Sequence, residues 1–326
     1  MPDTVSPPPD APKQKRHGGK RSWDEKPIHL NSKNTGDLVR ASAEIMGEDP
    51  RDADEVGFMA RLLVQATLPH SKPTGLVHRR TNGGLTIEMV GHPEYGLAYG
   101  TYPRLLLSWV TTEAARTKSP SLDLGHSLSS FLAQLGLWRS GGPRGSITTL
   151  RRQLDKLFRS TVAWTYRGDG RELECGLRPI EQRELWWDPR RPDQGELFNS
   201  RIVLNQRFYE ELVKRPVPLD MRALRLLAKL RSPLALDIYT WLTYRMSYLR
   251  EPTEIGWAAL QMQFGADYHL ERQFRAAFLE KLKVVKELYP AAKVAPGDGG
   301  LSLWPSPTHV PARAAGQLID LTPPPK

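Results

Sequence analysis

The stretch Leu270-Glu271-Arg272-Gln273-Phe274, with Phe278 four residues further on, decides the fold that we predict for this chain. Apolar residues recur at helical spacing from Gly265 to Leu288 and cations lie on the opposite face, which predicts one basic amphipathic helix. The preceding Trp257–Gly265 is expected to be a short apolar helix, closed by Gly265 in a left-handed C-cap. A short helix, a glycine turn and a longer basic helix are typical of a helix-turn-helix unit, whose second helix enters the DNA major groove.

The same pattern occurs earlier in the chain. Gln134-Leu135-Gly136 parallels Gln263-Phe264-Gly265, and Leu150-Arg151-Arg152-Gln153-Leu154 parallels the run at Leu270. Upstream, residues 107–111 resemble residues 239–243. Three matched blocks in one order, offset by about 120 to 132 residues, predict two copies of one domain.

The composition allows two domains and favours an anionic partner. The chain has 326 residues, of which 39% are hydrophobic, enough for two separate cores. Lys and Arg number 46 against 36 Asp and Glu, which gives a net charge of +10. Such an excess indicates nucleic acid or an anionic membrane surface, or only a solvated surface. Its concentration on two predicted helices favours nucleic acid.

Several classes of protein are disfavoured by the sequence. Cys175 is the single cysteine, so no disulfide framework or cysteine metal site is expected, and its thiol is expected to be buried and inert. No apolar run follows Met1, and the longest apolar stretches, such as Leu62–Leu68, are too short to cross a bilayer. We therefore expect a soluble protein of a reducing compartment, with no membrane partner and no cofactor.

The predicted fold class is α+β and mostly helical, with two tandem winged-helix domains related by an internal duplication. The predicted divisions are a disordered basic arm at 1–34, a first domain at 35–187, a linker at 188–196, a second domain at 197–310 and a disordered tail at 311–326. The N-terminal arm either tracks phosphates or acts as a solubilising tail.

Within the first domain, the sequence predicts a helix from residue 35, a break at 48–50 and a second helix at 55–68. A hairpin is expected across Asn82-Gly83-Gly84. Helices are then expected at 102–116 and 146–158. The strands predicted at 161–166 and 171–177 would form the wing, the hairpin that follows a recognition helix.

The second domain is predicted to follow the same plan. It begins with a strand at 200–204 and includes helices at 206–213, 220–229 and 232–249, the last buried nearly all round. A second wing is expected from the strands at 293–295 and 301–304.

The second half resembles a known family. The runs at 216–220, 231–239 and 241–245 look like the plasmid-encoded RepA replication initiators of bacteria, as do Trp257…Leu260…Gln263-Phe264-Gly265 and Leu288-Tyr289-Pro290. The resemblance is specific over about 195–310 and weaker over 35–190. It implies a bacterial cytoplasmic protein that binds repeated sites (iterons) in the duplex DNA of a plasmid origin and controls copy number. It also implies opening of the duplex, recruitment of a host initiator and helicase, and activity as a monomer or homodimer.

Candidate DNA contacts lie on both basic helices and in both wings. Arginine can bond guanine O6 and N7 together, threonine can meet a thymine methyl group, and lysine more often meets phosphate. On the first helix an ordinary amphipathic surface is the alternative; on the second, Glu280 is expected to pair with Lys283, and Gln273 lies on the flank. The candidates are Thr148, Thr149, Arg152, Lys156, Arg159, Arg272, Arg275, Lys283, Arg167, Arg171 and Lys293.

Three further interpretations concern function. The chain has no phosphate-binding loop of the P-loop type and no paired histidines for a metal site, so we expect no enzyme and no metal. A winged-helix transcriptional repressor that regulates its own replication gene is the alternative function. The tail residues Gln317, Leu318 and Leu321 faintly resemble a peptide that docks on the bacterial sliding clamp. The alternative is a short apolar segment of a disordered tail that binds no partner.

Overall fold

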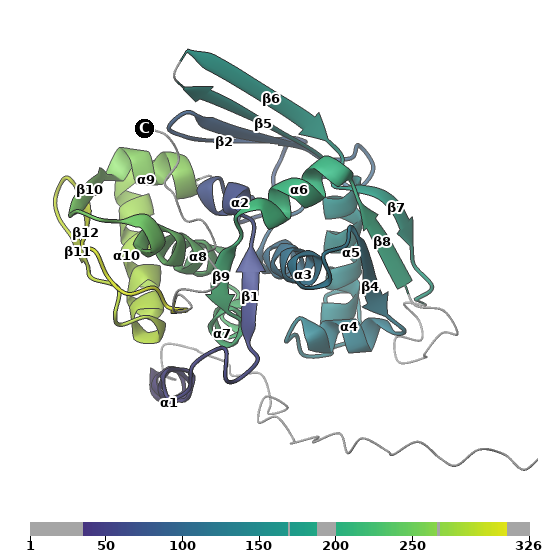
Figure 1. Ribbon diagram of the computed structural model, residues 1–326, viewed down its shortest axis with the longest axis horizontal. Coiled ribbons are helices and arrows are strands. Elements are labelled where there is room, and N and C mark those ends of the chain that lie inside the picture. Colours follow the sequence, from purple (N-terminus) through teal and green to yellow (C-terminus); the bar gives the residue numbers. More distant parts are fainter. Residues whose placement is uncertain (1–34, 169, 188–199, 266–267, 312–326) are drawn as a thin grey trace, which may run out of the picture.

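The computed structural model describes residues 35–168, 170–187, 200–265 and 268–311. The predictions for the N-terminal arm, the 188–196 linker and the clamp-like tail lie outside these residues. The described chain is α+β, as predicted, with helices and several small sheets. Figure 1 shows β1 and β9 side by side at the centre, with the later elements on one side and most of the earlier elements on the other.

The first part of the chain forms five helices and eight strands in the described residues. They are α1 (Thr35–Met46), β1 (Val56–Met59), α2 (Arg61–Gln65), β2 (Val77–Asn82), β3 (Leu85–Val90), α3 (Thr101–Thr117), β4 (Ser121–Gly125), α4 (Leu128–Gln134), α5 (Ser146–Arg159), β5 (Thr161–Gly168), β6 (Arg171–Leu177), β7 (Ile180–Glu184) and β8 (Ser200–Leu204).

The second part continues with α6 (Gln206–Lys214), β9 (Val217–Asp220), α7 (Met221–Lys229), α8 (Pro233–Tyr248), β10 (Thr253–Gly256), α9 (Trp257–Phe264), α10 (Glu271–Leu288), β11 (Val294–Pro296) and β12 (Gly300–Leu303). The predicted basic helix is therefore confirmed, but it begins at Glu271 and not near Gly265.

Two three-stranded sheets share one topology. The sheet of the first half has the order β4-β8-β7, and that of the second half has the order β10-β12-β11. In each sheet the first strand, β4 or β10, follows a long helix, α3 or α8. Two helices come next in the chain, α4 and α5 or α9 and α10. The last strand in the chain, β8 or β12, lies in the middle of the sheet. Below, "module 1" means β1 to β8 and "module 2" means β9 to β12.

The hairpin predicted as the first wing occupies a different place. β5 and β6 form a hairpin, but β5 also pairs along its length with β3, from Val90↔Thr161 to Leu85↔Tyr166. The result is a four-stranded sheet, β2-β3-β5-β6, which combines two hairpins far apart in sequence. The strands that correspond to β11 and β12 are instead β7 and β8, because β8 pairs with β4 and β7 pairs with β8. The assignment of the first wing to 161–177 is thus corrected.

The predicted boundary between the domains falls inside this module 1 sheet. Ser200–Leu204, expected to open the second domain, pairs antiparallel with both β4 and β7.

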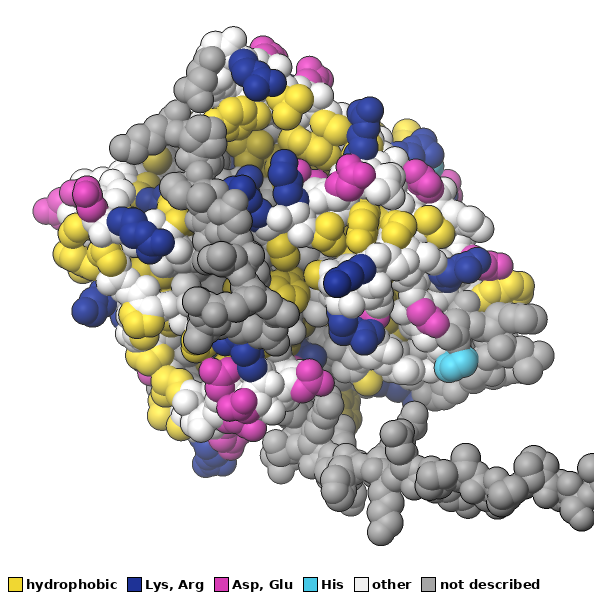
Figure 2. All heavy atoms as spheres, viewed as in Figure 1, with side chains coloured by type: hydrophobic (Ala, Val, Ile, Leu, Met, Phe, Trp, Pro, Cys, Tyr) yellow, Lys and Arg dark blue, Asp and Glu magenta, His cyan; other side chains and the backbone are white. Residues whose placement is uncertain are grey.

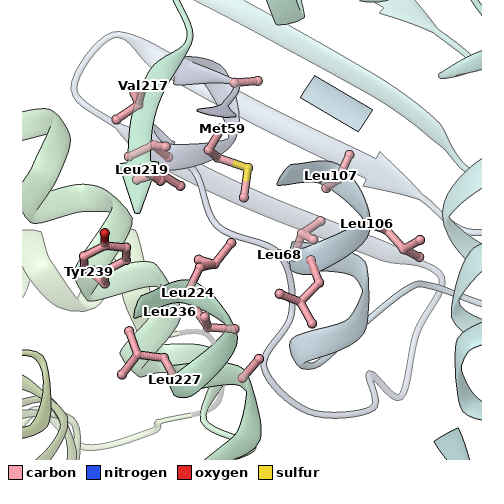
Figure 3. Packing of buried hydrophobic residues seen from close by; sticks show 14 of the residues in the cluster. Met59, Leu68, Leu106, Leu107, Val217, Leu219, Leu224, Leu227, Leu236 and Tyr239 are labelled. Atoms are coloured by element: carbon pink, nitrogen blue, oxygen red, sulfur yellow. The ribbon is translucent and has the colours of Figure 1, made fainter. Parts of the chain in front are cut away.

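The predicted helix at 55–68 is wrong. Val56–Met59 is a strand that pairs antiparallel with β9, and only Arg61–Gln65 is helical. Figure 3 shows the apolar core beneath this pair, where Met59 of β1 lies among side chains of module 2 such as Leu219 and Leu224. The β1–β9 pair therefore joins the two modules.

The helix α8 is buried nearly all round, as predicted. Ser232 caps it, since its side chain accepts a hydrogen bond from the Ala235 N–H, and Pro233 occupies the first turn. The left-handed cap expected at Gly265 is wrong, because its φ is −91°. A Cβ there would lie 2.6 Å from Cγ of Gln261, so close packing requires this glycine. Gly136, after α4, does have a positive φ, of 67°.

Candidate nucleic-acid interface

The turn before α5 is held to the helix by hydrogen bonds. Ser140 and Ser146 each accept, through the side chain, a hydrogen bond of 2.8 Å from the backbone N–H of the other. The hydroxyl of Thr148 donates to the carbonyl of Gly142 at 2.9 Å. The side chain of Thr148 is exposed but already has a structural partner, and Thr149 is half-buried. The N-terminal turn of α5 and the loop before it therefore form one ordered surface.

The C-terminal half of α5 is covered by the segment 95–99. Lys156 is 8% exposed, and its Nζ donates to the carbonyl of Leu97 at 3.2 Å and lies 5.0 Å from the Tyr99 ring centre. The guanidinium of Arg159 lies over the ring of Tyr95 at 4.4 Å. Gln153 accepts a hydrogen bond from the Tyr99 N–H.

This covering corrects the prediction that Lys156 lies on an open polar face with Arg152 and Arg159. Burial lowers the pKa of Lys156, and the nearby charges of Arg152 and Lys72 lower it further. Its ammonium group is satisfied inside the protein rather than presented to solvent. Of the three cations, Arg152 is the exposed one.

The helix α10 presents a more open face. Arg272 and Lys283 are exposed, while Phe274, Phe278 and Leu282 on the other side are buried. Gln273, expected on the flank, is also exposed. This face of α10 is therefore available to a ligand.

Arg275 has structural partners. Its guanidinium lies 5.1 Å from the ring centre of Trp257 and donates to the carbonyl of Gly297 at 3.1 Å. It also lies 3.6 Å from the carboxylate of Asp298. These contacts fix the turn between β11 and β12 against α10. The expected pairing of Glu280 with Lys283 is not the one found, because Glu280 pairs with Lys281 at 2.6 Å.

The hairpin cations are exposed. Arg167 pairs with Glu172 across β5 and β6 at 2.9 Å, and Arg171 and Lys293 lie at the surface. Arg167 and Arg171 belong to the four-stranded sheet. They therefore do not lie on β7 and β8, the strands that correspond to β11 and β12. Lys293 lies beside β11, in the position expected for it.

The loop between α4 and α5 is a further candidate surface that helical periodicity does not mark. Trp138 is 52% exposed there, and Arg144 is exposed. From Leu124 to Leu154 the chain contains no Asp or Glu. That absence is visible in the sequence and marks the stretch as electropositive.

The face of the molecule in Figure 2 shows Lys and Arg side chains interspersed with acidic and apolar ones. Among the described residues, no three or more His, Cys, Asp or Glu side chains gather as a metal-binding group. Within the same residues no helix is long and apolar enough to cross a bilayer.

Residues 97–258 match the sequence model of the family described as plasmid-encoded RepA protein. The match covers just under half of the chain and shows that this part is similar to the RepA family. The matched residues run from the segment that covers α5 to the first turn of α9, so they include both long core helices. The family resemblance read from the sequence is thus confirmed, although the match begins earlier than residue 195 and ends before α10.

No curated protein matches the chain. One solved structure, titled "Crystal structure of the RctB domains 2-3, RctB-155-483", aligns at 12% identity and a TM-score of 0.42, covering 74% of this chain and 94% of that one.

Proposed function

We propose that this protein is a plasmid replication initiator that binds repeated duplex sites in a plasmid origin through two winged-helix modules. The match of residues 97–258 to the RepA family model supports the role in plasmid replication. The structural observation that carries the proposal is the repeated topology. Both β4-β8-β7 and β10-β12-β11 are three-stranded sheets that flank a pair of helices in the helix-turn-helix order. This order of elements supports a winged-helix assignment for each module.

The antiparallel pairing of β1 with β9 further supports an internal duplication. Each of these strands comes before the long central helix of its module, α3 or α8. Their antiparallel register, from Val56↔Asp220 to Met59↔Val217, is the kind of pairing that two copies related by a twofold axis would make. Two hairpins, β2–β3 and β5–β6, are then additions to module 1, and they pair with each other.

The two modules do not present equal surfaces for DNA. The exposed Arg272 and Lys283 make α10 the better candidate for insertion into a major groove. On α5 only the N-terminal part remains open, with Arg152 and Thr148, because the segment 95–99 covers the rest. We propose that module 2 reads bases and that module 1 contributes mainly phosphate contacts.

Opening of the duplex, recruitment of a host initiator and helicase, and the choice between monomer and homodimer are parts of the same proposal, since the family resemblance implies them. We propose no catalytic activity for the chain itself. Repression of its own gene through the same modules is the second candidate, because a winged helix serves either role.

Footprinting of the DNA beside the gene tests the proposal. Protection of several direct repeats supports initiation, whereas protection of a lone palindrome over a promoter favours repression. A parallel measurement of affinity against salt should give a log–log slope of about −5 for six phosphate contacts. A flat response would contradict binding to duplex DNA altogether.

A further inference from the structure

The loop between α4 and α5 carries an exposed aromatic side chain. Trp138 is 52% exposed, more than Trp186 at 45% and Trp304 at 38%. The other described tryptophans are at most 9% exposed, namely Trp109, Trp164, Trp187, Trp241 and Trp257. A large indole left in solvent costs hydrophobic free energy that burial would recover. The exposed indole of Trp138 is therefore suited to a ligand that stacks on its ring.

The loop is ordered by its own hydrogen bonds. Besides the Ser140–Ser146 pair and the Thr148 hydroxyl, the N–H of Gly136 donates to Ala133 and that of Leu137 donates to Leu132. The loop is thus fixed to both helices of the pair, on both sides of Trp138. A fixed aromatic surface loses less entropy on binding than a mobile one.

The electrostatic surroundings favour a polyanion. Arg144 in the loop and Arg152 on α5 are both exposed, and the stretch Leu124–Leu154 has no carboxylate. The loop from Trp138 to Gly145 otherwise consists of Arg, Ser, Gly and Pro. An apolar protein partner would need a wider apolar surface than one indole ring provides.

Within a duplex, base faces are hidden by stacking, so an indole can reach them only at the cost of unstacking a base step. An unpaired base offers its face, and base–aromatic stacking beside arginines is a common mode of single-strand binding. We propose that the Trp138–Gly145 loop binds single-stranded DNA, with Trp138 stacked on one base and Arg144 contacting the backbone. This inference deepens the proposed function, on which it rests, because initiation produces unpaired strands next to the duplex sites.

The test uses the full chain and a 12-nucleotide oligothymidylate, together with a single-stranded oligonucleotide that carries 2-aminopurine. Trp138→Ala should weaken single-strand binding about tenfold or more. It should also abolish most of the 2-aminopurine quenching that stacking causes. Trp138→Phe should retain most of both, since it keeps an aromatic face. Trp304→Ala, at a tryptophan that is 38% exposed in module 2, is the matched control and should bind like the wild type.

The same variants are measured on duplex DNA that carries the origin repeats. Affinity of Trp138→Ala for the duplex should stay within about twofold of the wild type. Three outcomes would overturn the inference. Trp138→Ala loses equal affinity for single strands and duplex, it acts no differently from Trp304→Ala, or it leaves the affinity for the oligothymidylate unchanged. If the wild type binds no duplex, the proposed function fails. The single-strand measurements then still test whether the loop binds unpaired DNA.

Arg144→Ala leaves the indole in place, so it serves if Trp138→Ala does not fold. It should keep the 2-aminopurine quenching at saturation and reduce the salt slope of single-strand binding by about 0.7. An unchanged slope would remove Arg144 from the site, and absence of quenching by the wild type would refute the stacking itself.

Discussion

The guanidinium of Arg104 on α3 makes two hydrogen bonds, each of 2.7 Å, to the carboxylate of Asp237 on α8. Arg104 is 3% exposed and Asp237 is 7% exposed. The remaining N–H groups of Arg104 donate to the carbonyls of Leu68, Pro69 and Gly100. The bidentate pair therefore joins the long helices of the two modules in the interior of the protein.

His70 completes this network, since its Nε2 lies 2.8 Å from Oδ2 of Asp237. Burial opposes the ionisation of Asp237, but the charge of Arg104 and the hydrogen bonds from His70 and Arg104 hold its pKa below the ordinary value. The network fixes the relative orientation of α3 and α8, and with it the relation of the two proposed DNA-binding helices.

The first prediction is that Asp237→Ala strongly destabilises the fold. It leaves the Arg104 charge buried and uncompensated, which should cost about 3–5 kcal/mol in the free energy of unfolding. The matched control is Glu88→Ala, which breaks the pair of Glu88 with Arg79, whose side chain is 68% exposed. That change should cost at most about 1 kcal/mol. Urea titrations measure both, and equal costs would contradict a structural role for the buried pair.

The second prediction concerns acid stability. Burial is the main cause that lowers the pKa of His78 to about 4, while its ring hydrogen-bonds to the carbonyl of Thr67 at 2.9 Å. The unfolded state then binds the proton more readily, since its pKa is about 6.5. The contribution of neutral His78 is complete above pH of about 6.5 and is lost as the pH falls toward 4.

The replacement His78→Gln has no imidazole to protonate. Its free energy of unfolding should therefore fall less steeply than that of the wild type between about pH 6.5 and 4. Urea titrations at several pH values measure this slope. Parallel curves for the two proteins would show that His78 does not titrate with folding.

Local patterns predicted most helices and hairpins but failed where a distant segment decides the structure. The apolar run at 55–68 fits a helix or a strand by periodicity alone. Val56–Met59 becomes a strand because β9, more than 150 residues later, supplies its partner. The hairpin β5–β6 was predicted correctly, but its membership in a sheet with β3 depends on pairing that no local pattern reveals.

In the candidate site, too, local patterns predict some features and distant segments decide others. A helical wheel places Lys156 with Arg152 on a polar face, and that geometry is local. The segment that covers Lys156 lies more than 50 residues upstream, and its Tyr99 and Leu97 carbonyl are contacts that a wheel cannot include. Periodicity cannot mark Trp138, because it is an isolated tryptophan in a Gly- and Arg-containing loop. The absence of Asp and Glu from Leu124 to Leu154 does indicate an electropositive surface around it.

The third prediction separates Lys156 from Arg152. Lys156→Met keeps the aliphatic volume and removes a charge that is held at the Leu97 carbonyl. It should leave the salt slope of duplex binding unchanged, whereas Arg152→Ala should make the slope less steep by about 0.9 if Arg152 meets one phosphate. Binding measured from low to physiological salt compares the two. A loss of slope in Lys156→Met would place its ammonium on the DNA.

The last prediction concerns two arginines one turn apart on α10. Arg272 is exposed, so if it reads a guanine through O6 and N7, Arg272→Ala should cost about 1–3 kcal/mol at one base pair and relax discrimination there. Arg275 holds the β11–β12 turn through Gly297 and Trp257, so Arg275→Ala should lower thermal stability and weaken binding evenly across sequences. Affinities for single-base variants of the repeat, with melting curves, distinguish the two roles. Loss of discrimination at one base pair in Arg275→Ala, with unchanged stability, would reverse the assignment and make Arg275 the residue that reads the base.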